Sequence, residues 1–244
     1  MPADARMAII GKGRLGRALA AALEKAGMSV EGPFGRGADG GDAPIVLLCV
    51  PDAAIADAAR AVSAREGRLV GHCSGASTLA PLAPHEAFSM HPLMTVTDDG
   101  VPPRFDGAGC AVAGSTPRAR EIASALARRI GMRPFAIADS DRALYHAAAS
   151  MASNYLVTLE GAAERLGALA GVRREHLAPL ARAALENWAR MGARSALTGP
   201  IARGDDATVA RQRAAVAARA EGILPLWDAM ADATRAFAGE RDDR

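Results

Sequence analysis

A glycine pattern near the N-terminus is the first group of residues whose spacing points to a chemistry. It reads G-x-G-x-x-G and consists of Gly11, Lys12, Gly13, Arg14, Leu15 and Gly16. In such a turn the first glycine permits a tight bend, the second admits a diphosphate, and the third lets helix and strand pack closely. The N–H groups that begin the next helix would hold the anion. We therefore expect these six residues to bind a dinucleotide; the alternative is a glycine-rich turn without a nucleotide.

One arginine bears on which nicotinamide nucleotide would bind. NAD sites place a carboxylate about 20 residues beyond the glycines, whereas NADP sites offer an arginine to the 2′-phosphate. Glu31 falls within the expected second strand, and Arg36 lies on the loop after it. Arg36 therefore favours NADP as the cofactor, with a solvated loop arginine as the alternative.

Polar side chains follow later strand candidates, at the edge where ligands of open α/β sheets bind. Ser74 could hold a substrate carboxylate or a carboxamide. His91, which precedes Pro92, could exchange a proton near neutral pH. Both are candidate catalytic residues, and hydrogen-bonded structural roles are the alternative.

A second polar group lies in an otherwise apolar helical segment. His146, Ser150, Ser153 and Asn154 have spacings of four, three and one, which place them on one side of a helix. Polar groups on a buried helix need partners, because an unpaired group is costly. A bound ligand would supply them, which makes His146 and Asn154 catalytic candidates; neighbouring backbone carbonyls are the alternative partners.

The elements that would position these residues change in type along the chain. In the first half, apolar runs alternate with helical segments, which is typical of βαβ units. The expected strands are Met7–Ile10, Ser29–Glu31, Ile45–Val50, Leu69–His72, Ala87–Met90, Cys110–Ala113 and Pro134–Ile137. The expected helices are Leu15–Lys25, Ala53–Ala64 and Pro117–Ile130, the last capped by Ser115 or Thr116. The segment between Gly32 and Pro44 is rich in glycine and predicts a loop or a single turn.

The second half is helical. Its expected helices are Arg142–Ala170, Arg174–Met191, Ala207–Ala220 and Ile223–Phe237. We therefore predict an α/β fold, with a Rossmann-like doubly wound parallel sheet over residues 1–138 and an all-α domain over residues 139–244. The helical domain is too apolar to stand alone, so we expect it to form a homodimer and to complete the substrate site.

Composition excludes several classes of function. The 244 residues carry a net charge of only +2, and 4% are aromatic, so we expect no nucleic acid partner. The apolar run Ile45–Val50 is far shorter than the ~20 residues of a membrane span, so we expect no membrane partner. The three cysteines include no C-x-x-C, which favours reduced thiols, a cytoplasmic location and no bound metal.

Segments spread over most of the chain carry a family resemblance. They are Gly11–Ala20, Arg36, Cys49–Asp52, His72–Ala76, Ser89–Leu93, Ala152–Tyr155 and Leu197–Asp205. In these segments the sequence resembles a bacterial family of unknown function that joins a Rossmann-like domain to a helical C-terminal domain. That family is related to pyrroline-5-carboxylate reductase and the 6-phosphogluconate dehydrogenase superfamily. The short segment after Arg36 departs from the usual pattern, which leaves the adenine-side contacts open.

The resemblance also implies roles for particular residues. Val50 and Pro51 match a turn that lies against the nicotinamide ribose in related dehydrogenases. Asn154 matches an asparagine on the helix that opens the second domain, but the accompanying lysine is missing, and His146 could replace it. The pair His91-Pro92 is similar to one in prephenate dehydrogenases, where the histidine contacts the substrate hydroxyl.

These features predict an NADP-dependent oxidoreductase. It would transfer hydride between nicotinamide and a small carbonyl, hydroxy-acid or imine substrate. The alternatives are a prephenate- or arogenate-like dehydrogenase, and a non-catalytic NADP-binding sensor that kept the cofactor turn and lost the lysine.

Overall fold

The computed structural model describes residues 6–98 and 101–239. Contacts between Cα atoms divide the chain into two compact units, residues 1–153 and 154–244. The sheet and the helix that follows it belong to the first unit, and the second unit is helical.

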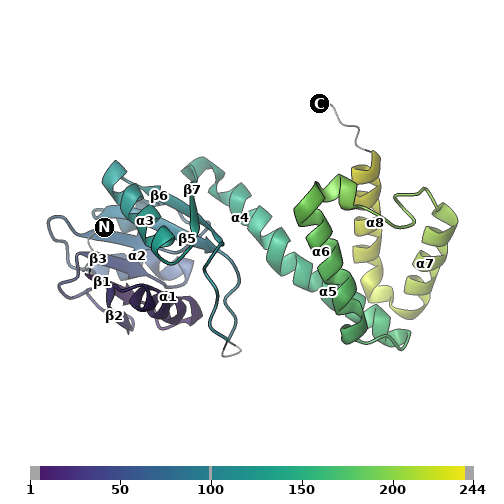
Figure 1. The fold of residues 1–244 in the computed structure, drawn as a ribbon, viewed down its shortest axis with the longest axis horizontal. Helices are drawn as coiled ribbons and strands as arrows, with labels where there is room; N and C mark the ends of the chain where they lie inside the picture. Colours follow the sequence, from purple (N-terminus) through teal and green to yellow (C-terminus); the bar gives the residue numbers. More distant parts are fainter. Residues whose placement is uncertain (1–5, 99–100, 240–244) are drawn as a thin grey trace. The chain divides into compact units, whose positions relative to one another are not determined.

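A seven-stranded sheet forms the centre of the first unit (Figure 1). Its strands lie in the order β2-β1-β3-β4-β5-β6-β7, and of the described pairs only β5 with β6 is antiparallel. The strands are β1 Arg6–Ile10, β2 Ser29–Phe34, β3 Ile45–Leu48, β4 Leu69–His72, β5 Glu86–Leu93, β6 Gly109–Gly114 and β7 Arg133–Ala136. The strand order reverses at β1, between β2 and β3, which is where Rossmann-like sheets bind ligands. The predicted Rossmann-like fold is confirmed.

Helices cover both faces of this sheet. Because side chains alternate along a strand, Met7 and Ile9 of β1 join the core beneath α1 (Arg14–Lys25) and α3 (Pro117–Arg129). Ala8 and Ile10 join the opposite core, beneath α2 (Ile55–Ala61). A strand that is apolar on both faces is typical of a buried parallel sheet.

Local signals explain how α3 begins. The Thr116 hydroxyl accepts a hydrogen bond from the N–H of Ala119 at 3.1 Å, and Pro117 occupies the first turn. This is the N-cap and proline arrangement that the sequence predicts. The segment Gly35–Pro44 contains no helix, as expected from its glycines.

Several element boundaries differ from those expected. β2 and β5 run on to Phe34 and Leu93, whereas α2 is preceded by a 3₁₀ turn over Asp52–Ala54. His91 therefore lies inside β5, paired with Ala111 of β6, and not after the strand as expected. The antiparallel partner causes this extension, because it supplies hydrogen bonds beyond the end of β4.

The helices of the second half are also less regular than expected. The segment predicted as one helix consists of α4 (Arg142–Ser150), a π-helical turn (Met151–Tyr155) and α5 (Leu156–Leu169). A π turn closes i→i+5 hydrogen bonds, so the uniform helical spacing assumed for His146 and Asn154 does not hold.

The remaining helices are α6 (Arg174–Ala196), α7 (Asp206–Arg219) and α8 (Leu224–Gly239). Gly192 interrupts α6 with φ 78° and ψ 168°, next to the predicted helix end at Met191. None of the helices in the described residues has the length and hydropathy needed to span a bilayer.

Gly71 of β4 provides a test of how tightly the sheet is packed. A Cβ on Gly71 would overlap the ring of Phe88 on β5, which is fully buried. We expect Gly71→Ala to lower the free energy of unfolding by about 1–3 kcal/mol through overpacking. Urea unfolding measures this loss, and Gly71→Ala combined with Phe88→Leu should recover part of it. Equal stability of the wild type and Gly71→Ala would contradict the packing described.

Candidate functional site

The turn between β1 and α1 has the shape that the glycine pattern predicts. Gly11 has φ 126°, and a Cβ there would overlap the carbonyl oxygen of Cys49. A Cβ on Gly16 would overlap the carbonyl oxygen of Gly11. These two glycines therefore let β1, the start of α1 and the residue after β3 come into backbone contact.

Gly13 differs from the other two glycines, because a Cβ built on it would meet no atom of residues 6–98 and 101–239 within 4 Å. It is the N-cap of α1, and no side chain in the described part of the chain caps this helix end. The first N–H groups of a helix have no partner within the helix. Open space above such uncapped donors suits a diphosphate, so the residues present fit a dinucleotide.

The other residues of the motif surround this opening in different ways. Leu15 packs against the core beneath α1, and Arg14 is exposed. The backbone carbonyl of Lys12 accepts a hydrogen bond from Nη1 of Arg17 at 2.7 Å. Leu15 therefore anchors the turn, while Arg14 is accessible to a ligand.

The predicted nicotinamide-side turn follows β3. The N–H of Cys49 donates to the carbonyl of Ile10 at 2.7 Å, which holds this turn beside the glycines. Val50 is half-buried against the core beneath α2, and Pro51 is exposed. The two residues therefore begin at the same edge of the sheet as Gly11.

Arg36 is exposed on the loop after β2. A buried arginine, Arg68, holds this loop by donating to the carbonyls of Gly41 at 2.6 Å, Asp39 at 3.4 Å and Ser63 at 2.8 Å. Burial lowers the pKa of Arg68. The connection from β2 to β3 contains no helix, and the Arg68 guanidinium supports this loop in place of one.

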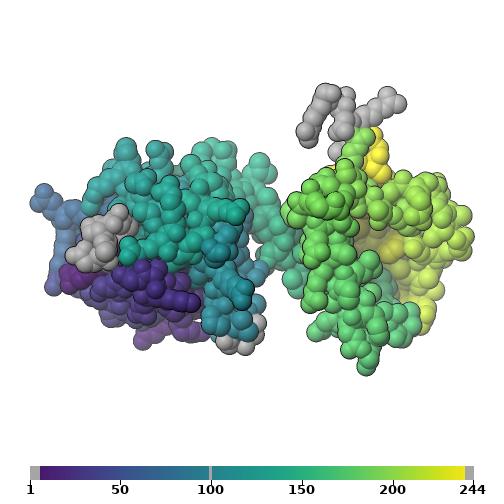
Figure 2. Space-filling view, viewed as in Figure 1, coloured from purple at the N-terminus to yellow at the C-terminus, as the bar shows by residue number. Residues whose placement is uncertain are grey.

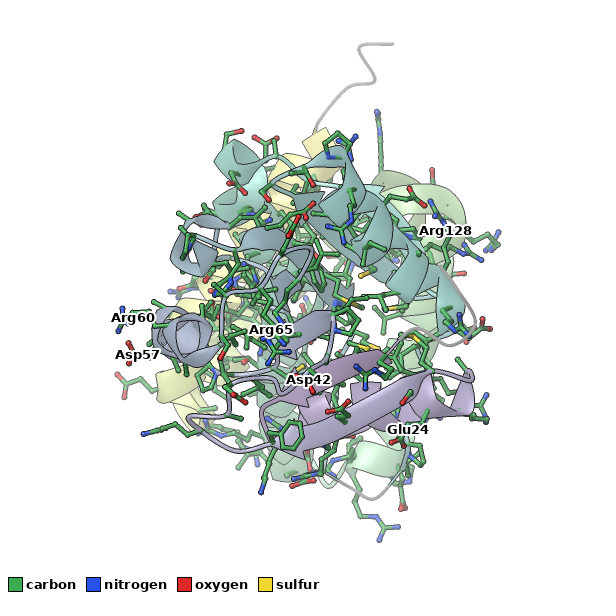
Figure 3. The ribbon with its side chains drawn as sticks, turned by 90° about the vertical axis from the view of Figure 1, so that its left-hand side faces the viewer. Glu24, Asp42, Asp57, Arg60, Arg65 and Arg128 are labelled. Atoms are coloured by element: carbon green, nitrogen blue, oxygen red, sulfur yellow. The ribbon has the colours of Figure 1, made fainter. Side chains whose placement is uncertain are left out.

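An ion pair lies beside the same loop. Asp42 pairs with Arg65, and the two side chains are labelled in Figure 3. The Oδ1 atom of Asp39 accepts from the N–H of Gly41 at 3.0 Å. Both loop carboxylates therefore have partners within the loop or next to it.

Ser74 follows β4, and its hydroxyl is occupied by other groups of the protein. It donates to Oδ2 of Asp52 at 2.7 Å and accepts from the N–H groups of Ala76 and Ser77 at 3.2 and 2.9 Å. The Ser74 side chain therefore ties the turn after β4 to the turn after β3. This geometry favours a positioning role over direct substrate contact.

His72 is fully buried and hydrogen-bonded at both ring nitrogens. Nδ1 accepts from the N–H of Ser74 at 3.1 Å, and Nε2 lies 3.0 Å from the carbonyl of Thr78. Nε2 therefore carries the proton and donates it to that carbonyl. Burial lowers the pKa of His72, so this ring is a neutral structural group.

Two of the predicted histidines come together in the first unit. The rings of His91 on β5 and His146 on α4 have centroids 6.1 Å apart. A Cβ on Gly75 would come within 2.9 Å of both rings, at His146 Cδ2 and His91 Cε1. Gly75 therefore provides the space in which the two imidazoles approach each other.

Tyr145 joins this cluster, although no motif or spacing in the sequence marked it as a candidate. Its hydroxyl lies 2.7 Å from Nδ1 of His91, and the two rings meet edge to face. Burial raises the pKa of Tyr145 to about 12, so the hydroxyl keeps its proton at neutral pH. Burial, followed by the nearby His146, lowers the pKa of His91 to about 4. At neutral pH the pair is therefore uncharged.

A buried arginine fixes the start of α4 and thereby this cluster. Arg142 donates from Nε to Oδ1 of Asp139 at 2.6 Å and from Nη2 to the hydroxyl of Ser89 at 2.8 Å. Ser89 lies two residues before His91 on β5, and Tyr145 follows Arg142 by three residues. Arg142 therefore holds the first turn of α4 against the strand that carries His91.

Asn154 does not belong to this cluster. It is exposed in the π turn, within the helical unit, where its carbonyl accepts from the hydroxyl of Thr158 at 3.1 Å.

The cysteines are free, with Sγ of Cys49 and Cys73 3.7 Å apart. Within residues 6–98 and 101–239, no three metal-ligating side chains are grouped as a metal would need.

A family model matches residues 108–234, slightly more than half of the chain, and describes DUF2520, a domain of unknown function. The chain belongs to this family. A search of curated proteins finds no match.

Solved structures from several organisms share the fold of this DUF2520 protein over nearly all of both chains. A Bacteroides fragilis protein, provisionally assigned as an NADP oxidoreductase, is 18% identical, with 96% of this chain and 99% of that chain covered and a TM-score of 0.83. An Aspergillus terreus reductive aminase in complex with NADPH and ethyl levulinate is 19% identical, with coverage of 98% and 96% and a TM-score of 0.66. Plasmodium falciparum pyrroline carboxylate reductase with NADP bound is 11% identical, with coverage of 95% and 97% and a TM-score of 0.60. At these identities the likeness shows the fold alone.

The low pKa of His91 gives a direct test of the cluster. We expect nitrogen-15 NMR to show a neutral His91 ring down to about pH 5, with protonation near pH 4, because burial and His146 disfavour the charged ring. His146→Ala should raise this pKa but leave it below the ordinary value of about 6.5, since burial remains. His91→Gln identifies the signal by its loss. A His91 that titrates near 6.5 in the folded wild type would refute the packing of this cluster.

Proposed function

We propose that this DUF2520 protein is an NADP-dependent oxidoreductase that transfers hydride between nicotinamide and a small carbonyl, hydroxy-acid or imine substrate. The observation that carries the proposal is the open, uncapped helix start at Gly13, at the point where the strand order reverses. The NADP-binding and oxidoreductase descriptions of proteins with the same fold support it.

The cofactor would be held by residues of three turns. The N–H groups that begin α1 at Arg14 and Leu15 would bind the diphosphate, Arg36 the 2′-phosphate, and Val50 with Pro51 the nicotinamide ribose. When bound, the nicotinamide supplies or accepts the hydride, while the protein orients the reactants and handles the proton.

His91 and Tyr145 are suited to handling that proton. Because Tyr145 stays protonated, its hydroxyl can donate to Nδ1 of His91, which places the proton of the neutral ring on Nε2. As the reacting carbon is reduced, Nε2 would give its proton to the substrate oxygen or nitrogen while Nδ1 takes the proton of the Tyr145 hydroxyl. The tyrosinate left behind would regain its proton from solvent. His146, which meets His91 at Gly75, would orient the substrate, and Asn154 stays a candidate for substrate contact.

Binding and turnover can be tested separately. We expect calorimetry to detect NADPH binding by the wild type, and Gly13→Asp to weaken it at least about tenfold, because a carboxylate would stand where the diphosphate binds. His91→Gln should keep NADPH affinity but slow NADPH oxidation about 10²–10⁴-fold, the usual contribution of a general acid. The substrate panel would contain 2-oxo acids, cyclic imines with and without amines, and, with NADP, prephenate and arogenate.

Each outcome assigns a different function. Absence of binding of both NADPH and NADH to the wild type overturns the proposal. Binding without turnover of any substrate supports the non-catalytic sensor. Turnover restricted to prephenate or arogenate supports the dehydrogenase that the pair His91-Pro92 suggests.

We also propose that the helical unit forms a homodimer. Among its described residues only Val209, Val216, Ile223 and Ala231 are buried hydrophobics, and α5 and α6 bury none. On α6, Leu180 and Trp188 are 69% and 55% exposed, and helical spacing puts them on one stripe with Met191. Figure 2 shows part of the α6 surface in green. A second copy of the chain would cover this stripe, because an apolar surface of this kind marks an interface.

Charge substitutions on two faces of α6 test the dimer. We expect the wild type to be dimeric by light scattering, and Trp188→Glu to make it monomeric, because a carboxylate cannot be buried unpaired in an apolar interface. Arg182→Glu adds a carboxylate on the opposite face of α6 and should leave the dimer intact. A monomeric wild type contradicts the proposal, as does equal dissociation by both variants.

A further inference from the structure

The side chain of Lys12 reaches from the glycine turn to the end of β2. A Cβ built on Gly35 would lie 3.8 Å from Cε and 4.0 Å from Nζ of Lys12. The ammonium group therefore lies over Gly35, the residue before Arg36. Two cations from different segments of the chain are thus placed at the same edge of the sheet.

The nearby carboxylates do not neutralise these two cations. Glu31 has Oε1 4.0 Å from Nη1 of Arg6, and the loop carboxylates Asp39 and Asp42 have the partners described above. Within residues 6–98 and 101–239, neither Lys12 nor Arg36 forms an ion pair. Glu31, a β2 residue that could accept ribose hydroxyls as in an NAD site, pairs with Arg6 instead.

We propose that Lys12 is a second cation for the 2′-phosphate and determines, together with Arg36, the preference for NADP over NAD. The inference rests on the proposed function and adds a specificity residue to it. A phosphate monoester carries about −1.5 to −2 charges at pH 7, which two cations can balance. NAD has a neutral hydroxyl at that position, so it gains nothing from the second cation. This role differs from that of the N–H groups at Arg14 and Leu15, which would meet the diphosphate common to both nucleotides.

The two lysines of the chain provide a matched pair for the test. Lys12 lies two residues before α1, and Lys25 is exposed in the last turn of that helix. We expect Lys12→Met to weaken NADPH binding about 10- to 100-fold in calorimetry, the loss of one charge-assisted contact, and to change NADH binding by less than about threefold. Lys25→Met should change neither affinity.

The result can separate this proposal from the proposed function. Equal loss of NADPH and NADH affinity in Lys12→Met would place Lys12 on the diphosphate and overturn the proposal, while the oxidoreductase assignment would stand. Unchanged NADPH affinity in that variant would also overturn it. Absence of binding of either nucleotide to the wild type would instead remove the proposed function itself.

A spectroscopic measurement checks the same contact without turnover. Reductive ¹³C-methylation of the full chain labels Lys12, Lys25 and the N-terminal amine, and Lys12→Met identifies its signal. We expect 2′,5′-ADP to shift the Lys12 signal and not that of Lys25, whereas 5′-ADP leaves both in place. A shift of Lys12 of similar size with 5′-ADP would contradict recognition of the 2′-phosphate.

Discussion

The candidate site depends on backbone contact between three segments at the centre of the sheet. Gly11 touches the carbonyl of Cys49, and Gly16 touches the carbonyl of Gly11, at distances that admit no Cβ. This contact sets the direction in which α1 leaves β1, and therefore where its uncapped N–H groups point. It also places the turn after β3 beside the glycines. The diphosphate end and the reacting end of a nucleotide would thus share one rigid edge, because neither side of the contact can move without the other.

The cluster of His91, Tyr145 and His146 is held together by different contacts. An antiparallel partner extends β5 so that His91 stays in the sheet beyond the end of β4, and buried Arg142 fixes α4 against the same strand. The environment then keeps His91 neutral and Tyr145 protonated. Both groups are therefore uncharged at neutral pH, which avoids the cost of burying an unpaired charge. The glycine at position 75 matters because any side chain there would separate the imidazoles.

Sequence alone predicted the fold well where a short-range signal decides the structure. The glycine spacing, the apolar runs and the Thr116-Pro117 cap each act within a few residues, and the corresponding elements are present. The length of β5 could not be predicted, since it depends on pairing with β6, about 20 residues later in the chain. The π turn at Met151–Tyr155 was missed for a related reason, because no composition rule distinguishes it from an α-helix.

The candidate site was predicted only in part. His91 and His146 were selected by their chemistry and do lie together, but Tyr145 and Arg142 were not, because their importance comes from a tertiary contact with β5. Ser74 was selected for its hydroxyl, and the structure engages that hydroxyl with Asp52 and two backbone N–H groups. Residue types in the sequence indicate which chemistry is possible. The hydrogen-bond partners that the fold brings together decide which of these side chains are free to contact a ligand.

The loop after β2 has a consequence for how this scaffold can diversify. Its ten residues from Gly35 to Pro44 contain no helix, and guanidinium groups from outside the loop donate to its carbonyls: Arg68 to Asp39 and Gly41, and Arg6 to Asp42. Backbone carbonyls are present whatever side chains the loop carries. The hydrogen bonds from Arg68 would therefore persist after most substitutions at exposed loop positions such as Arg36. Substitutions at such positions would therefore change the charge that the loop presents at little expense to either core of the sheet.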